Sequence, residues 1–393
     1  MASFESRFND YCTALEASGR RRTLGAAAAQ AARPVIADFS HNDYLGFAHD
    51  PALIEAGHAM AQRYGVGSTG SRLLSGNLTP HVDLEQAIAL AKGTEAALIF
   101  NSGYQANSSA LAALLDAKVL GAEPLVFSDR LNHASLHHAC QLMNVRQIRY
   151  RHNDMAHLRE LLSAHHEEDR PKFIVAETVF GMDGDVLDMP ALVALADEFD
   201  AFLYLDEAHA TGVLGRSGYG LASGYMQRDG KSRGVAMGTF SKALGAAGAY
   251  VACSAAVREY LVNRCTGFIY STAPSPAVIG AVSAAWERLP RMDAEREQLM
   301  RRAAQLRARL HESGFNTGTS NTHIIPLIVG TEEAALDLKA WLLKCGIVSS
   351  AIRPPTVPPH TARVRIALSL SHTDTQLEAL CDALDRWKDR EQR

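Results

Sequence analysis

Short apolar runs alternate with longer amphipathic segments through the middle of the chain, from about Glu85 to Cys253. The apolar runs have the length of buried strands, and several are separated by helix-length segments such as Met155–His165 and Met189–Phe199. The predicted strands are Ala97–Phe100, Leu125–Phe127, Phe173–Ala176, Ala201–Leu205, Val235–Gly238 and Ala249–Ala252. This alternation predicts an α/β fold with a mostly parallel sheet, in which ligands bind beyond the carboxyl ends of the strands.

The pattern changes after Ser275, where longer helical segments are followed by a second group of strands. These later elements are expected at Pro276–Glu287, Asp293–Ser313, His323–Val329, Glu332–Cys345, Ile347–Ile352 and Arg363–Leu368, before a terminal helix. They predict a compact α+β second domain. We therefore expect an N-terminal segment over residues 1–45, a large domain over 46–285 and a small C-terminal domain over 286–393.

The composition of the 393 residues is that of an ordinary globular protein, with 47% hydrophobic and 21% charged residues. A net charge of -4 gives no support for binding to nucleic acid or to an anionic membrane. The six cysteines are scattered, which favours reduced thiols over disulfides or zinc. The alanine-rich run after Arg22 starts too far along the chain for a secretory signal, and no stretch has the ~18 apolar residues of a membrane span. We expect a soluble, cytoplasmic protein.

Two short elements carry the strongest chemical signal. The strand Ala201–Leu205 runs directly into Asp206, Glu207, Ala208 and His209, and a small-residue turn further on contains Lys242. An acid and a histidine at a strand end, followed by such a lysine, suit pyridoxal 5'-phosphate (PLP). The lysine would form a Schiff base with the aldehyde, and Asp206 would keep the pyridine nitrogen protonated. A surface lysine and an N-cap or ion-paired aspartate are the alternatives for each residue alone.

Three further segments could complete a site. His133 could stack on a flat heteroaromatic ring, because His133 and His137 lack the glutamate that the zinc-protease motif requires. The segment 101–107 follows a strand and opens a helix, so its backbone N–H groups could bind a phosphate. Arg353, held before two prolines, suits a carboxylate clamp, although an exposed loop arginine is the alternative.

The segment 65–70 imitates the glycine fingerprint of dinucleotide-binding folds. It follows a helical pattern rather than a strand, and no clear helix follows it. A glycine-rich active-site loop is the preferred interpretation.

Taken together, the motifs resemble those of the α-oxoamine synthases, PLP enzymes of aminotransferase fold type I. The resemblance covers nearly the whole chain. It rests on Asn42-Asp43-Tyr44-Leu45-Gly46, Met182-Asp183-Gly184-Asp185, Asp206-Glu207-Ala208-His209, Thr239-Phe240-Ser241-Lys242 and Tyr270-Ser271-Thr272. It implies a large domain with a mostly parallel seven-stranded sheet, a smaller α+β C-terminal domain and a homodimer with shared active sites.

The resemblance also implies roles for individual residues. Catalysis would rest on Lys242, His133, Asp206 and His209. The cofactor would be held by these residues together with Gly103, Tyr104 and Thr239, and by Tyr270 and Thr272 reaching into the neighbouring subunit. The substrates would contact Arg21, Asn42, His133, Arg353 and Thr356, and no metal is expected.

Two positions depart from the family pattern. Gly181 stands where relatives often carry a serine that helps to hold the cofactor, so we expect cofactor binding weaker by ~1 kcal/mol. Glu207 replaces an aspartate seen in some members, with no expected effect on the chemical steps.

The implied reaction is a decarboxylative condensation of an amino acid with an acyl thioester. Within the family, the segment 351–358 is most like the branch of biotin biosynthesis that joins L-alanine to pimeloyl-CoA. The sequence leaves open whether CoA or an acyl-carrier protein carries the acyl group. The alternatives are glycine C-acetyltransferase, serine palmitoyltransferase and 5-aminolevulinate synthase activities, or a binding protein of the same fold without turnover.

Overall fold

The computed structural model describes residues 3–24, 34–228 and 231–391, in two compact units. The larger unit comprises residues 42–181 and 186–297, and the smaller one comprises residues 1–41, 182–185 and 298–393. These units join the N-terminal segment to the C-terminal part of the chain, whereas the sequence prediction divides the chain at residues 45 and 285. The alanine-rich run weighed as a targeting signal lies outside the described residues.

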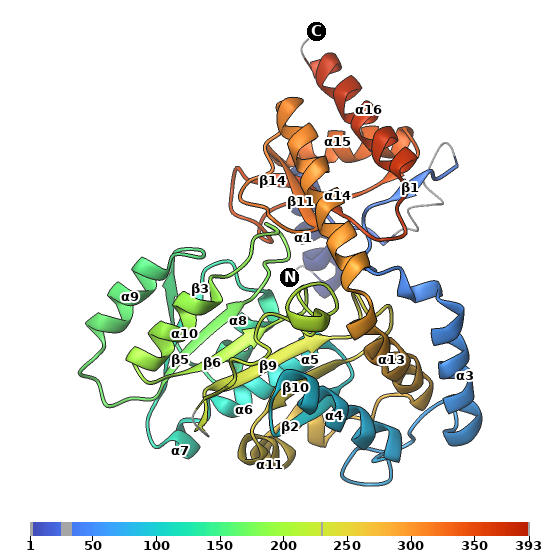
Figure 1. Ribbon diagram of the computed structural model, residues 1–393. Helices are drawn as coiled ribbons and strands as arrows, with labels where there is room; N and C mark the ends of the chain where they lie inside the picture. The colour runs from blue at the N-terminus through green and yellow to red at the C-terminus, as the bar shows by residue number, and fades with distance from the viewer. Residues whose placement is uncertain (1–2, 25–33, 229–230, 392–393) are drawn as a thin grey trace. The chain divides into compact units, whose positions relative to one another are not determined.

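The larger unit is built on a seven-stranded sheet, as expected (Figure 1). In spatial order its strands are β2 (Ala96–Phe100), β10 (Ala249–Cys253), β9 (Gly234–Thr239), β6 (Ala201–Asp206), β5 (Lys172–Glu177), β3 (Leu125–Asp129) and β4 (Gln147–Tyr150). Strand β10 runs opposite to the other six strands, which share one direction. The predicted α/β fold with a mostly parallel sheet is confirmed.

Strand β4 is absent from the sequence prediction, because three of its four residues are not fully buried. It lies at the edge of the sheet, where one side of a strand has no neighbour to cover it. An edge strand therefore lacks the continuous apolar run that marks the central strands.

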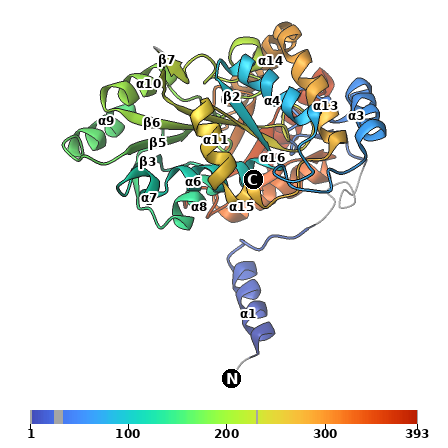
Figure 2. The same ribbon diagram turned by 90° about the horizontal axis from the view of Figure 1, so that it is seen from below.

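Helices cover both faces of this sheet, which explains why its central strands are apolar at consecutive positions. On one face, side chains such as Val175 and Tyr204 pack with α6 (Ala112–Leu114), α8 (Ala134–Leu142) and α11 (Ala255–Arg264). Figure 2 shows α11 crossing in front of the strands. On the other face, Ile174 and Leu203 pack with α9 (Met155–Ala164) and α10 (Met189–Glu198).

The helices of the larger unit begin where the sequence supplies capping groups. Asp154, Asp188 and Ser254 accept backbone N–H groups at the starts of α9, α10 and α11. Proline occupies the first turn of α3 (Pro51–Tyr64), α4 (Thr79–Lys92) and α13 (Pro276–Arg288). The remaining short elements are η1 (Phe47–His49), α5 (Gly103–Ala106), η2 (Asn107–Leu111), α7 (Ala117–Leu120), η3 (Arg216–Gly218), β7 (Gln227–Arg228), β8 (Lys231–Ser232), α12 (Thr266–Ile269) and η4 (Leu289–Arg291).

The smaller unit has its own antiparallel sheet in the order β11 (Ile324–Gly330), β14 (Ala362–Ala367) and β13 (Ser350–Ile352). A separate pair joins β1 (Ala37–Asp38) to β12 (Ile347–Val348) in parallel. Its helices are α1 (Phe4–Ala17), most of α14 (Asp293–Glu312), α15 (Glu332–Lys344) and α16 (Asp374–Glu391). The expected strand over 347–352 is thus two short strands in different sheets.

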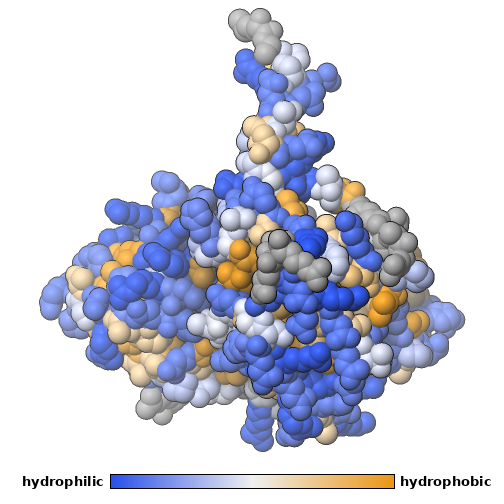
Figure 3. Space-filling view, turned by 90° about the horizontal axis from the view of Figure 1, so that it is seen from above, coloured by the Kyte–Doolittle hydropathy of each residue, from blue (hydrophilic) through white to orange (hydrophobic). Residues whose placement is uncertain are grey.

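The surface in Figure 3 is mainly hydrophilic, with apolar residues interspersed. No helix in the described part of the chain has the length and apolar character of a membrane span.

Candidate active site

The carboxyl ends of the parallel strands bring several of the predicted site residues of the larger unit to one edge of the sheet. Asp206 ends β6, and its register partner on β9 is Met237, two residues before Thr239. Lys242 lies in the turn after β9, and His133 lies in the loop after β3. The strand order therefore gathers side chains that are far apart in the sequence, as ligand sites in such sheets require.

Lys242 belongs to a chain of hydrogen bonds through His209. The Lys242 Nζ lies 2.7 Å from His209 Nε2, and His209 Nδ1 lies 2.7 Å from the hydroxyl of the fully buried Tyr44. That hydroxyl donates to Asn42 Oδ1 at 3.0 Å. A Tyr44 hydroxyl that donates to Asn42 matches the His209 tautomer with its proton on Nδ1 and with Nε2 toward the Lys242 amine.

Asp206 is held by a second network. Its Oδ2 accepts from Asn107 Nδ2 at 2.6 Å, and its Oδ1 accepts from the Ala208 backbone N–H at 2.8 Å. Asn107 opens the π-helical turn η2, and its side-chain oxygen accepts from the Tyr204 hydroxyl at 3.1 Å. Turns of this kind are frequent at functional sites. The carboxylate that was expected to face a pyridinium is thus 3% exposed and fixed by two donors.

The same network extends to His133. Asn107 Nδ2 also donates to Ser135 Oγ at 2.9 Å, and Ser135 Oγ lies 2.7 Å from His133 Nδ1. The Ser135 backbone N–H donates to the same Nδ1 at 3.3 Å, so Nδ1 is an acceptor and Nε2 carries the proton. His133 thereby caps α8 while its orientation is fixed.

The charge state of His133 follows from its surroundings. Although the residue is exposed, the protein around it displaces enough water to lower the pKa of the imidazole. The charge of Asp206 opposes this shift and that of Lys242 reinforces it, so the three side chains are close enough to interact. A neutral, accessible imidazole is the form suited to stacking on a flat ring.

A second carboxyl lies beside Asp206. Glu177 ends β5, is 5% exposed and is the register partner of Asp206. Burial and the charge of Asp206 raise the pKa of Glu177 to about 8, against the opposing effects of Lys242 and of backbone N–H groups. Two adjacent buried carboxyls cannot both ionise cheaply, so this one retains its proton at neutral pH.

The residues expected to hold the cofactor phosphate fall into two groups. Gly103 and Thr239 are neighbours, since a Cβ on Gly103 would lie 3.6 Å from Thr239 Cβ. Tyr104 sets its ring edge-on to His133 at a centroid distance of 6.3 Å. Tyr270 is 82% exposed and Thr272 is also exposed. The shared role of these last two stays a prediction.

Gly181 leaves room for the imidazole of His209. A Cβ at this position would lie 2.2 Å from His209 Nε2. The serine that relatives often carry could not stand here with His209 as it is placed. From the sequence, Gly181 is the loss of one hydroxyl. In the structure, the His209 imidazole occupies the space that a side chain at position 181 would need. The weaker cofactor binding expected for this position stays a prediction.

The remaining predicted substrate residues lie in the smaller unit. Arg21 pairs with Glu16, while Arg22 Nη2 donates to Thr356 Oγ1 at 3.0 Å. Arg353 donates to the backbone oxygen of Gly19. A cavity of about 290 Å³ is lined by Arg20, Arg22, Ala351, Ile352, Arg353, Pro354 and Thr356. Arg20 and Arg22, which flank the predicted Arg21, line this arginine pocket, and the substrate role of Arg21 stays a prediction.

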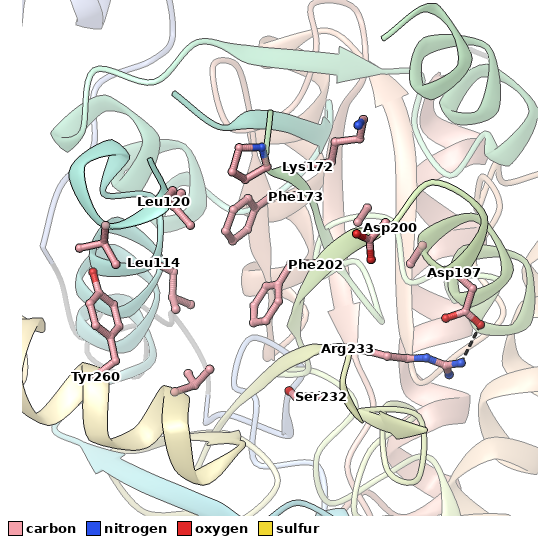
Figure 4. A pocket seen from close by; sticks show the side chains of 15 residues that line it. Leu114, Leu120, Lys172, Phe173, Asp197, Asp200, Phe202, Ser232, Arg233 and Tyr260 are labelled. Atoms are coloured by element: carbon pink, nitrogen blue, oxygen red, sulfur yellow. Dashed lines mark hydrogen bonds and ion pairs between the residues drawn. The ribbon is translucent and has the colours of Figure 1, made fainter. Parts of the chain in front are cut away.

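A larger cavity of about 800 Å³ lies elsewhere in the larger unit (Figure 4). Its floor includes Phe173 and Phe202, whose ring centroids are 5.4 Å apart near the starts of β5 and β6. These are the amino ends of the strands, opposite the edge that carries Asp206. None of the predicted site residues lines it.

The histidines near His133 have separate partners. His137 Nδ1 lies 2.7 Å from Gln147 Oε1, and His138 Nδ1 lies 3.1 Å from the Tyr104 hydroxyl. Among the described residues, no group of three or more His, Cys, Asp or Glu is arranged to hold a metal ion.

Sequence reasoning assigned no role to Tyr44, Asn107, Ser135 or Glu177. Glu177 carried a usable signal, because it is an acid at a strand end like Asp206. The contacts of Tyr44 and Asn107 could not be predicted from the sequence, because their partners His209 and Asp206 are 165 and 99 residues away in the chain.

The donor set of this site fits pyridoxal phosphate. It offers a primary amine at Lys242, a fixed carboxylate at Asp206 and a neutral imidazole at His133, together with Gly103 beside Thr239. These are the groups that such a cofactor uses for attachment, ring protonation, stacking and phosphate binding.

Comparison with known proteins agrees with this chemistry. Residues 34–384 match the family model described as aminotransferase class I and II. A chain from Gluconacetobacter diazotrophicus named 8-amino-7-oxononanoate synthase is 50% identical over 354 residues, covering 89% of this chain and 87% of the relative. One from Magnetococcus marinus, which bears that name provisionally, is 50% identical over 386 residues, covering 96% of each.

Among solved structures, a serine palmitoyltransferase with its PLP internal aldimine aligns over 98% of both chains, with a TM-score of 0.85 and 26% identity. The fold and site therefore define a PLP-dependent enzyme of fold type I. The chain belongs to the aminotransferase class I and II family, within it to the α-oxoamine synthases, and it is an acyltransferase.

Proposed function

We propose that the enzyme condenses L-alanine with a pimeloyl thioester, releasing CO2 and the free thiol and forming 8-amino-7-oxononanoate for biotin synthesis. The 50% identity to relatives named for this product supports the proposal. CoA is the proposed carrier of the pimeloyl group.

When bound, pyridoxal phosphate supplies an aldehyde for attachment to amines and an electron-poor ring that stabilises negative charge at the amino-acid Cα. In our proposal Asp206 keeps the ring nitrogen protonated, and His133 orients the ring by stacking. Lys242 takes the proton as the Cα–H bond breaks, and it returns a proton to Cα after CO2 has left. His209, whose Nε2 lies 2.7 Å from Lys242 Nζ, fixes the position of that amine.

The observation that carries the choice of acyl group is the arginine pocket. Arg22 and Arg353 are two of its three cations, and burial together with the charge of Arg22 lowers the pKa of Arg353. Guanidinium groups bind carboxylates in paired hydrogen bonds. Pimeloyl and succinyl chains end in a carboxylate, whereas acetyl and palmitoyl chains do not, so this pocket supports a diacid, and the identity to relatives named for the pimeloyl product favours pimeloyl.

A panel of alanine, glycine and serine against pimeloyl-, acetyl-, succinyl- and palmitoyl-CoA, scored by free thiol, tests the proposal. We expect alanine with pimeloyl-CoA to give the highest kcat/KM. Arg22→Ala should raise the KM for pimeloyl-CoA about tenfold and leave that for alanine unchanged. Arg7→Ala on α1 is the matched control.

Two further outcomes decide between the candidates. Serine palmitoyltransferase activity is the second candidate, favoured by the structural match, and preference for serine with palmitoyl-CoA would establish it instead. A Lys242→Ala protein that still turned over, or still gave an imine-type visible absorbance, would contradict the proposed site.

We also propose a homodimer, in which Tyr270 and Thr272 of one subunit contact the cofactor phosphate of the other. The exposure of both residues supports this. Sedimentation equilibrium should give twice the chain mass of 42.5 kDa. A monomer at micromolar concentration would rule out the shared site.

A further inference from the structure

Glu177 is a buried titratable residue to which the proposed reaction gives no role. It continues the alternation of Phe173 and Val175 along β5, so its side chain lies on the sheet face that packs against η2 and α8. Its register partner Asp206 directs its carboxylate to Asn107 of η2 on that face.

The Glu177 carboxyl contacts the backbone of two separate loops. The Gly181 N–H donates to Glu177 Oε2 over 3.4 Å, and the backbone N–H of His133 donates to the same carboxyl. Asn132 adds a second connection, since its Oδ1 accepts from the Glu177 N–H at 3.2 Å and its Nδ2 donates to Val175 oxygen at 2.7 Å. The loop that presents His133 is therefore tied to the end of β5.

Each of these loops sets one part of the active site. His133 presents its imidazole from the first loop, with Nδ1 held by Ser135. Gly181 in the second loop leaves the space that the His209 ring occupies, because a Cβ there would meet His209 Nε2. A displacement of either loop would move an imidazole that faces Lys242 or interacts with it.

The protonation state of this carboxyl suits the task. The charged and titratable groups that face it are Asp206 from β6, Lys242 from the turn after β9, and His133 from the loop before α8. A protonated Glu177 accepts N–H groups without placing a second negative charge beside Asp206. The electrostatic pairing of Asp206 with the cofactor ring is then preserved.

We propose that Glu177 is a positioning residue of the cofactor site, whose buried carboxyl fixes the loops of His133 and Gly181 and thereby both active-site imidazoles. The inference rests on the cofactor binding of the proposed function and is independent of the substrates chosen there.

The test compares the cofactor affinity of variants. Apoproteins of wild type, Glu177→Gln, Glu177→Leu and the control Glu85→Gln are titrated with PLP, and binding is followed by tryptophan fluorescence and by the visible absorption band. Glu85 is a matched control, because it is also a buried carboxyl that accepts a backbone N–H, from Ile99, and pairs with Arg72.

Glu177→Leu removes both acceptors and should raise the dissociation constant for PLP about tenfold and shift the visible band. Glu177→Gln keeps one acceptor oxygen, so an increase of about threefold is expected. Glu85→Gln should lower the melting temperature but bind PLP like wild type.

Wild-type affinity and an unchanged band in both Glu177 variants would overturn the inference. So would an equal loss of affinity in Glu85→Gln, because a general loss of stability would then explain it. If Glu177→Leu does not fold, the Glu177→Gln affinity decides alone. A wild-type protein that binds no PLP would instead refute the proposed function.

Discussion

At the scale of single residues, the chemistry depends on neighbours that hold the reactive groups in one state. Asp206 is fixed by Asn107 and by a backbone N–H, and His133 is held in one tautomer by Ser135. Asn107 is central, because it donates to Asp206 and to Ser135 and accepts from Tyr204. One side chain thus connects Asp206, the proposed partner of the ring nitrogen, to His133, the proposed stacking imidazole.

Asn107→Ala should therefore lower the free energy of unfolding of the apoprotein by about 1–3 kcal/mol, because it leaves buried partners without their hydrogen bonds. PLP affinity should fall as well, since Asp206 loses its side-chain donor. Urea denaturation and PLP titration measure the two effects. Asn263→Ala, which removes an exposed amide bonded to Glu259, is the control and should change stability by less than about 0.5 kcal/mol. Equal stability of the two variants would contradict this role of Asn107.

At the scale of elements, a buried ion pair joins the end of α4 to the loop after β6. Lys92 and Glu207 are both fully buried and form an ion pair. Lys92 also donates to the Tyr219 backbone oxygen at 2.7 Å, and Glu207 accepts from the Ala222 N–H at 2.7 Å. From the sequence, Glu207 is a replacement for aspartate with no expected effect. In the structure its side chain reaches Lys92 of α4, while the adjacent Asp206 faces Asn107. The longer side chain has a structural use.

Lys92→Met should lower the free energy of unfolding by about 3–5 kcal/mol, because Glu207 is left as an uncompensated buried charge. The double variant Lys92→Met with Glu207→Leu should recover part of that loss, since both charges are then removed. Arg159→Ala breaks the exposed pair with Glu198 and should cost no more than about 1 kcal/mol. Chemical denaturation of the three variants measures these differences; a Lys92→Met loss as small as that of Arg159→Ala would refute the prediction.

At the scale of the whole molecule, Glu177 gives stability a dependence on pH. Its pKa is about 8 in the folded protein against 4.5 for an ordinary glutamate. The folded state therefore keeps a proton that the unfolded chain releases, and stability falls as the pH rises from about 4.5 to about 8. His81, His137 and His372 act in the opposite sense, because burial lowers the pKa of each and their contribution to stability grows until the pH passes 6.5.

Above pH 6.5 the effect of Glu177 can be measured apart from that of the three histidines, because these histidines are then neutral in the folded and the unfolded protein. Between pH 6.5 and 8.5 the free energy of unfolding of the apoprotein should fall by about 2 kcal/mol. Thermal melts at both pH values measure this change, and Glu177→Gln should show a much smaller one. Burial also raises the pKa of the thiols Cys140, Cys253, Cys265 and Cys381, and ordinary thiols titrate near pH 9, so these groups add a smaller fall only near the upper end of this range, one that Glu177→Gln retains. A wild-type stability that is flat across this range would refute the assignment.

Most of the larger unit and the core of its site could be predicted from the sequence, because the signals are local. A buried strand shows itself as an apolar run, and Asp206 and Lys242 follow their strands within a few residues. The edge strand β4 was not predicted, because a strand at the edge of a sheet needs no continuous apolar run. The substitution at Gly181 was seen, but its steric reason needed the position of His209, 28 residues further along the chain.

The sequence by itself determined the α/β fold and the cofactor class, and it predicts Lys242, Asp206 and His209 as the reacting residues, because these signals lie in short motifs along the chain. Only the tertiary structure decided how those residues are held. The Tyr44 hydroxyl lies against His209 and Asn107 donates to Asp206, although both pairs are far apart in the sequence. The strand order places β5 beside β6, which makes Glu177 the register partner of Asp206. Protonation states followed from the same contacts, since burial and neighbouring charge are properties of the fold and not of the sequence.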